Sequence, residues 1–223
     1  MDNSVYQNPL ITRYASREMS ENFSDKKRFT LWRKLWIALA ESQSELGLNI
    51  SDAQIEEMKK YAESIDFDLA QKYEREVRHD VMAHIKAYGD QAKLSAPIIH
   101  LGATSCFVDC NSELIIIDHA LKTVKAKLVN VIKNLKDFAL KYKNLPTLGF
   151  THLQPAQLTT VGKRAALWLQ DLTMDYHGIV NLQNNFKLRG VKGTTGTQAS
   201  FLDLFEGDGQ KVKELEKKVV KKL

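Results

Sequence analysis

Cysteine is scarce in this sequence, with Cys106 and Cys110 alone among 223 residues. Two cysteines predict no disulfide framework, and such usage is typical of a reducing compartment. No run of apolar residues approaches the ~20 that a bilayer span requires. The amino terminus also lacks the basic and then apolar order of a secretory signal. These absences predict a soluble, cytoplasmic protein without membrane contact.

Excess charge is also confined to one place. The formal net charge is +5, but residues 211–223 carry six lysines and two glutamates, a net +4, which leaves about +1 for the rest. A nucleic-acid binder concentrates its basic residues on a motif with groove-reading or aromatic partners, and no such motif is found. Nucleic acid is therefore not expected as a partner, and the basic tail is predicted to be the solvated face of a helix.

Helix signals dominate, and strand signals are nearly absent. Ser24 is predicted to cap a helix that reaches about Leu46, because apolar residues recur at spacings of three and four. Ser51 and Gln54 form a capping box that opens a helix to about residue 64. Shorter helices are expected over residues 66–74 and about 80–88.

Two long helices follow. Apolar residues step by three and four from Leu114 to Tyr142, a period of 3.5, and again from Leu158 to Phe186. Pro155 suits the first turn of the second long helix. The sequence predicts an all-α protein, with an amino-terminal helical domain (residues 1–110) followed by part of a long-helix bundle domain (residues 111–223).

Four polar segments between the helices are not explained by periodicity: residues 78–80, 100–106, 149–155 and 190–198. Loops at the ends of rigid helices are suitable places for a polar site. His152 is predicted to lie just outside the amino end of the second long helix, where an anionic ligand can bind. The helix dipole disfavours imidazolium there, so a general-acid role requires a carboxylate partner. A structural or merely exposed histidine remains the alternative.

The other segments are ambiguous when each is taken alone. Arg78, His79 and Asp80 can grip a multiply functional ligand, or form a surface helix start that Asp80 caps. Thr104 and Ser105 can donate to a carboxylate or phosphate, or form a plain turn. The spaced glycines of residues 190–196 are weak indicators of phosphate binding, because they do not match a P-loop. The histidine and cysteine spacings match no metal motif, so neither a metal nor another cofactor is expected.

Taken in order, these segments resemble the fumarase/aspartase superfamily. Residues 149–154, Gly-Phe-Thr-His-Leu-Gln, resemble its second signature, and residues 102–105, Gly-Ala-Thr-Ser, stand where its first signature loop is kept. Within the superfamily, residues 78–84, 99–105, 155–160 and 192–200 are similar to the adenylosuccinate lyase family of the eukaryotic type. The similarity extends from Arg13 to Phe205.

The resemblance implies a β-elimination in purine biosynthesis. Such enzymes cleave adenylosuccinate to AMP and fumarate, and succinylaminoimidazole carboxamide ribotide to its carboxamide and fumarate. By similarity His152 is the general acid. Thr151, Thr104 and Ser105 would hold the succinyl part, while Arg78, His79 and Asp80 would surround the base and the ribose region. Arg13 and Tyr14 would contact the nucleotide phosphate, and three subunits of a homotetramer would build each site.

The sequence departs from the family in one large respect. The third signature, a loop that carries the catalytic base serine, is missing, and so is the glutamate that pairs with the acid histidine. The chain is therefore expected to be the amino-terminal part of such an enzyme, a truncated form that is inactive alone. Two alternatives remain: another fumarate-releasing lyase of the superfamily, or a non-catalytic helical assembly module.

Overall fold

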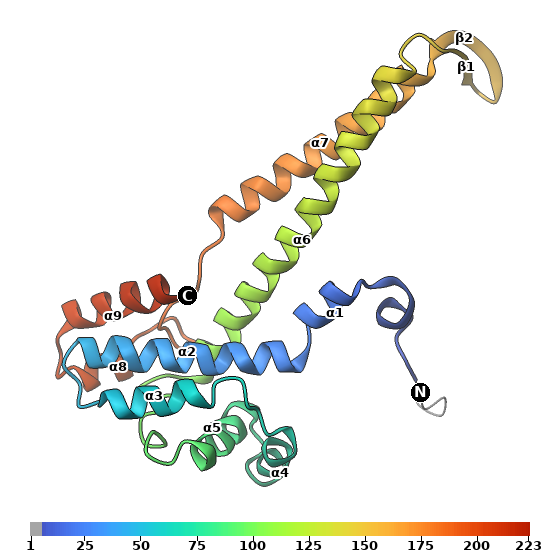
Figure 1. The fold of residues 1–223 in the computed structure, drawn as a ribbon. Helices are drawn as coiled ribbons and strands as arrows, with labels where there is room; N and C mark the ends of the chain where they lie inside the picture. The colour runs from blue at the N-terminus through green and yellow to red at the C-terminus, as the bar shows by residue number, and fades with distance from the viewer. Residues whose placement is uncertain (1–5) are drawn as a thin grey trace. The chain divides into compact units, whose positions relative to one another are not determined.

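The computed structural model describes residues 6–223 and forms two compact units (Figure 1). Unit 1 comprises Met1–Ile116 and Lys187–Leu223, and unit 2 comprises Ile117–Phe186. The longest helix, α6 (Ser105–Lys141), begins in unit 1 and continues into unit 2. The domain boundary expected at residue 110 stays a prediction.

Unit 1 is helical and follows the local capping signals. The Ser24 side chain accepts a hydrogen bond from the Lys27 N–H at the start of α2, and Ser51 with Gln54 forms the expected capping box of α3. The predicted helices are confirmed, although α3 ends at Lys60, before the expected residue 64. The elements are η1 (Leu10–Tyr14), α1 (Arg17–Asn22), α2 (Asp25–Glu45), α3 (Asp52–Lys60), α4 (Phe67–Val77), α5 (Asp80–Gln91), the start of α6, α8 (Ala199–Leu204) and α9 (Gly209–Lys222).

The core of unit 1 is built around α2. Trp32 and Trp36 are at most 1% exposed, and α9 contributes three buried apolar residues to the same cluster: Val212, Leu215 and Val219. Burial of these side chains stabilises the unit through the hydrophobic effect. The basic tail is therefore a helix, as predicted, but α9 is not simply solvated. Its lysines also reach acidic partners on α2: Lys218 contacts Glu45, and Lys222 contacts Glu41 and Glu45.

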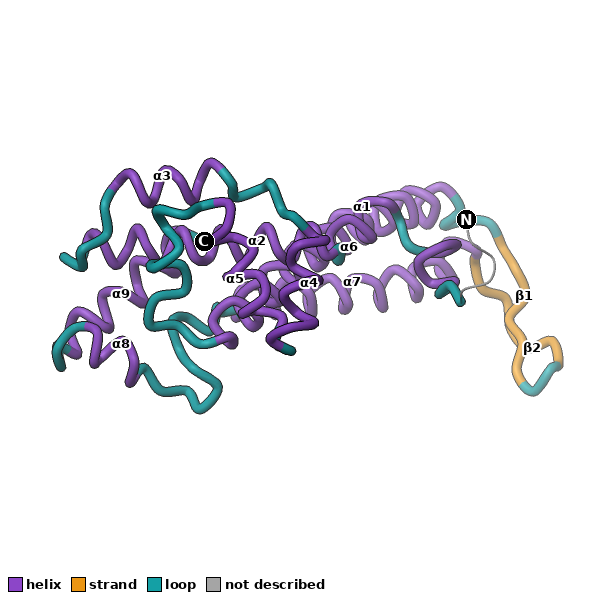
Figure 2. Tube along the Cα trace, turned by 90° about the horizontal axis from the view of Figure 1, so that it is seen from below, coloured by secondary structure: helices purple, strands orange, loops and turns teal. Residues whose placement is uncertain are grey.

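Unit 2 joins the remainder of α6 to α7 (Val161–Asn185) through a β-hairpin, drawn in orange in Figure 2. The antiparallel strands are β1 (Pro146–Thr151) and β2 (Gln154–Thr160). The prediction that Pro155 begins the second long helix is wrong, because Pro155 pairs with Phe150 in the hairpin. The helix begins at Val161, where the Thr160 side chain accepts from the Lys163 N–H. Residues 146–151 supply hydrogen-bond partners for the backbone of residues 154–160, which in a helix would find these partners within the helix itself.

The two long helices of unit 2 approach closely beside the hairpin. Gly162 allows this approach, because a Cβ there would overlap the Ala139 carbonyl. Farther along, Gln183 donates to Asp118 and accepts from Lys125. Much of the predicted apolar seams nevertheless remains exposed, including Val131, Phe138 and Trp168. Apart from the two strands, the all-α prediction is confirmed.

Membrane-spanning helices are not found over residues 6–223, where every helix is too short or too polar to cross a bilayer.

Candidate functional site

The first candidate segment lies where α4 ends and α5 begins. Arg78 adopts a left-handed conformation (φ 53°) as the C-cap of α4, and its N–H donates to the Glu74 carbonyl. His79, and not Asp80 as the alternative had it, is the N-cap residue of α5, and it makes no side-chain capping bond. The Asp80 side chain does accept a hydrogen bond from the Val81 N–H in the first turn. Asp80 is the first helical residue, and its Oδ1 lies 3.5 Å from His79 Nδ1. Both side chains are 46% exposed and accessible to a ligand.

The second candidate segment is the loop that leads into α6, and it is held from several sides. Trp36 Nε1 donates to His100 Nδ1 at 2.8 Å, and Gln43 donates to the Leu101 carbonyl. These contacts hold the loop at the start of α6, where Thr104 is exposed and Ser105 is half-buried. Burial, with a smaller contribution from His79, lowers the pKa of His100 to about 4. His100 is therefore a neutral anchor at neutral pH.

The carboxyl group of Asp109, one turn beyond Ser105 on α6, feels the charges of the first candidate segment. Burial, with a smaller contribution from Asp80, raises the pKa of Asp109 on α6 to about 6. Arg28, which lies 3.7 Å from Asp109, and His79 act in the opposite direction. The sequence motifs do not point to Asp109, although it stands four residues after Ser105 and so shares one face of the helix with it. The site in unit 1 thus combines imidazole, carboxyl, hydroxyl and guanidinium groups.

The third candidate pair, Arg13 and Tyr14, lies in η1. Figure 1 shows this turn in the amino-terminal arm that leads into α1. Both side chains are exposed, Tyr14 by 73%. A phosphate can be held by a guanidinium and a phenol of this kind. Their role as phosphate contacts stays a prediction.

His152 lies in unit 2, at the tip of the hairpin and not at a helix terminus as predicted. Its φ is 50° and that of Leu153 is 62°, so both turn residues are left-handed. α7 begins nine residues later, at Val161, and its dipole therefore cannot act on His152. Two-residue hairpin turns with this backbone are normally Asn-Gly or similar. Two bulky residues in such a turn are strained, and strain of this kind is concentrated at functional sites.

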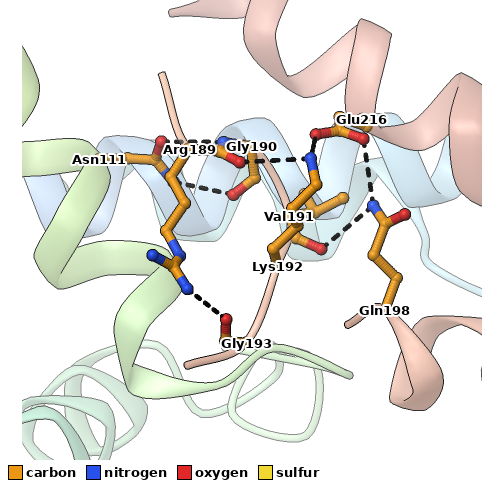
Figure 3. Close-up of polar contacts among 8 residues, drawn as sticks. All are labelled: Asn111, Arg189, Gly190, Val191, Lys192, Gly193, Gln198 and Glu216. Atoms are coloured by element: carbon orange, nitrogen blue, oxygen red, sulfur yellow. Dashed lines mark hydrogen bonds and ion pairs between the residues drawn. The ribbon is translucent and has the colours of Figure 1, made fainter. Parts of the chain in front are cut away.

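The predicted site residues are thus divided between the units. Thr151 and His152 lie in unit 2, and the other predicted binding residues lie in unit 1: Arg13, Tyr14, Arg78, His79, Asp80, Thr104 and Ser105. Over residues 6–223, no group of three or more His, Cys, Asp or Glu side chains is arranged to hold a metal ion. In the glycine-rich segment, Lys192 is paired with Glu216 (Figure 3), so this lysine is not free to bind phosphate.

Comparison with known proteins identifies the family. Residues 13–217 match a family model described as a lyase. The chain belongs to this lyase family. Among relatives, it is 54% identical over 223 residues to the adenylosuccinate lyase of Schizosaccharomyces pombe, covering 99% of this chain and 46% of the relative. It is 52% identical over 225 residues to that of Saccharomyces cerevisiae, covering 100% of this chain and 47% of the relative.

The fold of the lyase family is found in solved structures as well. A 3-carboxy-cis,cis-muconate lactonizing enzyme from Pseudomonas putida matches with a TM-score of 0.84 at 23% identity, covering 96% of this chain and 48% of that chain. At this identity the match shows the fold alone. The resemblance inferred from the motifs is confirmed, and the chain spans about half the length of the curated relatives it matches.

Proposed function

We propose that the protein carrying this chain is an adenylosuccinate lyase, which cleaves adenylosuccinate to AMP and fumarate. The related succinylaminoimidazole carboxamide ribotide would be cleaved to its carboxamide and fumarate. The strongest support is the 54% identity that extends over 99% of the chain to a relative of that name. The four polar segments that carry the resemblance also lie at helix ends or on a hairpin turn, where their side chains can meet a ligand.

The proposed reaction is a β-elimination from the succinyl group. A base removes the proton from the carbon beside a carboxylate, the electron pair forms the double bond of fumarate, and the C–N bond breaks. The leaving nitrogen takes a proton from a general acid. We assign that acid to His152, whose exposed position on the hairpin turn leaves its imidazole accessible. By the family resemblance, the base is a serine on a loop absent from these 223 residues.

The binding roles follow the chemistry of each group. The hydroxyls of Thr151, Thr104 and Ser105 can donate to the carboxylates of the succinyl part and stabilise the charge that develops there. Arg78, His79 and Asp80 would surround the ribose and the heterocyclic base of the nucleotide. Arg13 and Tyr14 would bind the phosphate, far from the bond that breaks.

We further propose that this enzyme is a homotetramer in the cytoplasm. Unit 2 leaves many large apolar side chains exposed, which supports assembly, because exposed apolar surface commonly marks an interface. Trp168 is 57% exposed, and Leu158 is 78% exposed. Helices from other subunits would cover these seams in a bundle. The two free cysteines are compatible with a reducing compartment.

The experiment that tests the proposal is a substrate panel on the full-length protein. Fumarate release, followed by ultraviolet absorbance, should occur with adenylosuccinate and not with argininosuccinate, malate or aspartate. Release from one of these other compounds alone would assign a different lyase of the superfamily. Release from none would favour a non-catalytic assembly role.

A further inference from the structure

The segment between α7 and α8, here called the glycine-threonine loop (residues 190–198), is held at its start by α6. The Asn111 side chain is fully buried and donates to the Gly190 carbonyl, while its own oxygen accepts from the Gly190 N–H. Arg189, which directly precedes the loop, donates to the Gly193 carbonyl. Figure 3 shows these contacts together. The loop therefore has a defined conformation in unit 1.

Glu216 of α9 bridges the two ends of this loop. Its Oε1 accepts from Lys192 Nζ, and its Oε2 accepts from Gln198 Nε2 at 3.2 Å (Figure 3). Gln198 Nε2 also lies 3.3 Å from the Val191 carbonyl, which closes the loop on itself. Both partners of Glu216 are donors, so the bridge requires a side chain with two acceptor oxygens. A carboxylate meets that requirement, whereas an amide has only one oxygen.

The backbone at Gly190 makes room for the bridge. Gly190 is left-handed (φ 75°), and a Cβ at this position would overlap Glu216 Oε1. Residues with a side chain are disfavoured in this backbone conformation. Only a glycine at position 190 thus allows the Glu216 carboxylate to approach the backbone this closely.

The loop lies against the segment that carries Thr104 and Ser105. A Cβ at Gly193 would lie 3.5 Å from the Thr104 side chain, and Cys106 Sγ lies 2.8 Å from Thr194 Oγ1. Just beyond the loop, Ser200 donates to the Gly102 carbonyl at 2.6 Å. The start of α6 is therefore held on one side by the loop that Glu216 bridges.

We propose that Glu216 is a positioning residue for the dicarboxylate part of the substrate. It holds the glycine-threonine loop against the start of α6, and so sets the orientation of the Thr104 and Ser105 hydroxyls. This inference rests on the proposed function. Lys192 then serves the loop as the partner of Glu216 and does not bind the substrate.

The test is Glu216→Gln in the full-length protein. In the variant, the NH2 group of the new amide faces either Lys192 or Gln198, both of which are donors. One end of the bridge therefore opens. We expect kcat/KM for adenylosuccinate to fall at least ~10-fold, the size of one lost hydrogen bond to a charged group. The inhibition constant of fumarate should rise by a similar factor, while that of AMP stays unchanged, because AMP lacks the dicarboxylate. General damage to the fold would change both constants.

Glu214→Gln is the matched control, since Glu214 is exposed on the same helix. It should behave as the wild type. Thr194→Val is the second variant, and it removes the hydroxyl beside Cys106 without altering the bridge. Thr194→Val should raise the inhibition constant of fumarate and leave that of AMP unchanged.

The proposal is overturned if Glu216→Gln matches Glu214→Gln, or if the constants for AMP and fumarate rise together. It is also overturned if Glu216→Gln does not fold and Thr194→Val binds fumarate normally. A wild-type protein that never cleaves adenylosuccinate would instead refute the proposed function itself.

Discussion

His152→Asn in the full-length protein separates the chemistry of His152 from the geometry of its turn. Asparagine adopts left-handed backbone more readily than other residues with a side chain, whereas histidine at φ 50° carries strain of roughly 1–2 kcal/mol. The substitution should therefore preserve the hairpin or stabilise it slightly. Asparagine has no titratable proton to give to the leaving nitrogen, so the general acid is lost.

Loss of a general acid commonly lowers turnover by ~10²–10⁴-fold, or about 3–5 kcal/mol of transition-state stabilisation. The free energy lost with the general acid is larger than the strain that the substitution relieves, and the two act in opposite directions. A fall in turnover of this size therefore cannot be explained by a change in the turn. The assay is kcat for fumarate release from adenylosuccinate, with His177→Ala on the exposed surface of α7 as the control. Turnover within a few-fold of the wild type in His152→Asn would remove His152 from the mechanism.

Two further predictions concern binding and pH. Arg13→Ala should raise KM for adenylosuccinate by roughly ten- to a hundred-fold with little change in kcat, because the phosphate is remote from the breaking bond; unchanged kinetics relative to Arg17→Ala would make Arg13 a surface residue. Burial lowers the pKa of His84 from 6.5 to about 4. Between these two pH values the unfolded chain therefore takes up a proton at His84, whereas the folded chain does not. Stability is then lost between pH 6.5 and pH 4, and His84→Phe should show a smaller drop in melting temperature between pH 7 and pH 5; an identical drop would contradict this assignment.

Where folding is governed by local signals, the sequence was sufficient. Ser24 and the pair Ser51 and Gln54 mark helix starts because each cap bonds to a backbone group within three residues. The hairpin could not be predicted in this way. Strand pairing is non-local, and Pro155 is acceptable both in the first turn of a helix and on an edge strand. The spacing of Leu158 and Val161 also matches a helix, so periodicity alone gave the wrong start for α7.

The candidate site was predictable only in part, for a related reason. The motif residues were found from their order along the chain, whereas the groups that influence them depend on tertiary structure. Asp109 acquires its raised pKa from burial and from Asp80, which lies far from it in sequence. Glu216 reaches Lys192 across 24 residues because α9 packs on the core of unit 1. No local pattern distinguishes Glu216 from Glu214, the other glutamate of the basic tail.

The central claim is that adenylosuccinate cleavage requires this chain together with a base that its 223 residues do not supply. Fumarate release from adenylosuccinate by the isolated chain and by the full-length protein, measured side by side at equal concentration, tests it most directly. The full-length protein should release one fumarate for each AMP, and the isolated chain should release none. Robust release by the isolated chain would contradict the account, because a base would then have to exist among the residues assigned to binding or to the core.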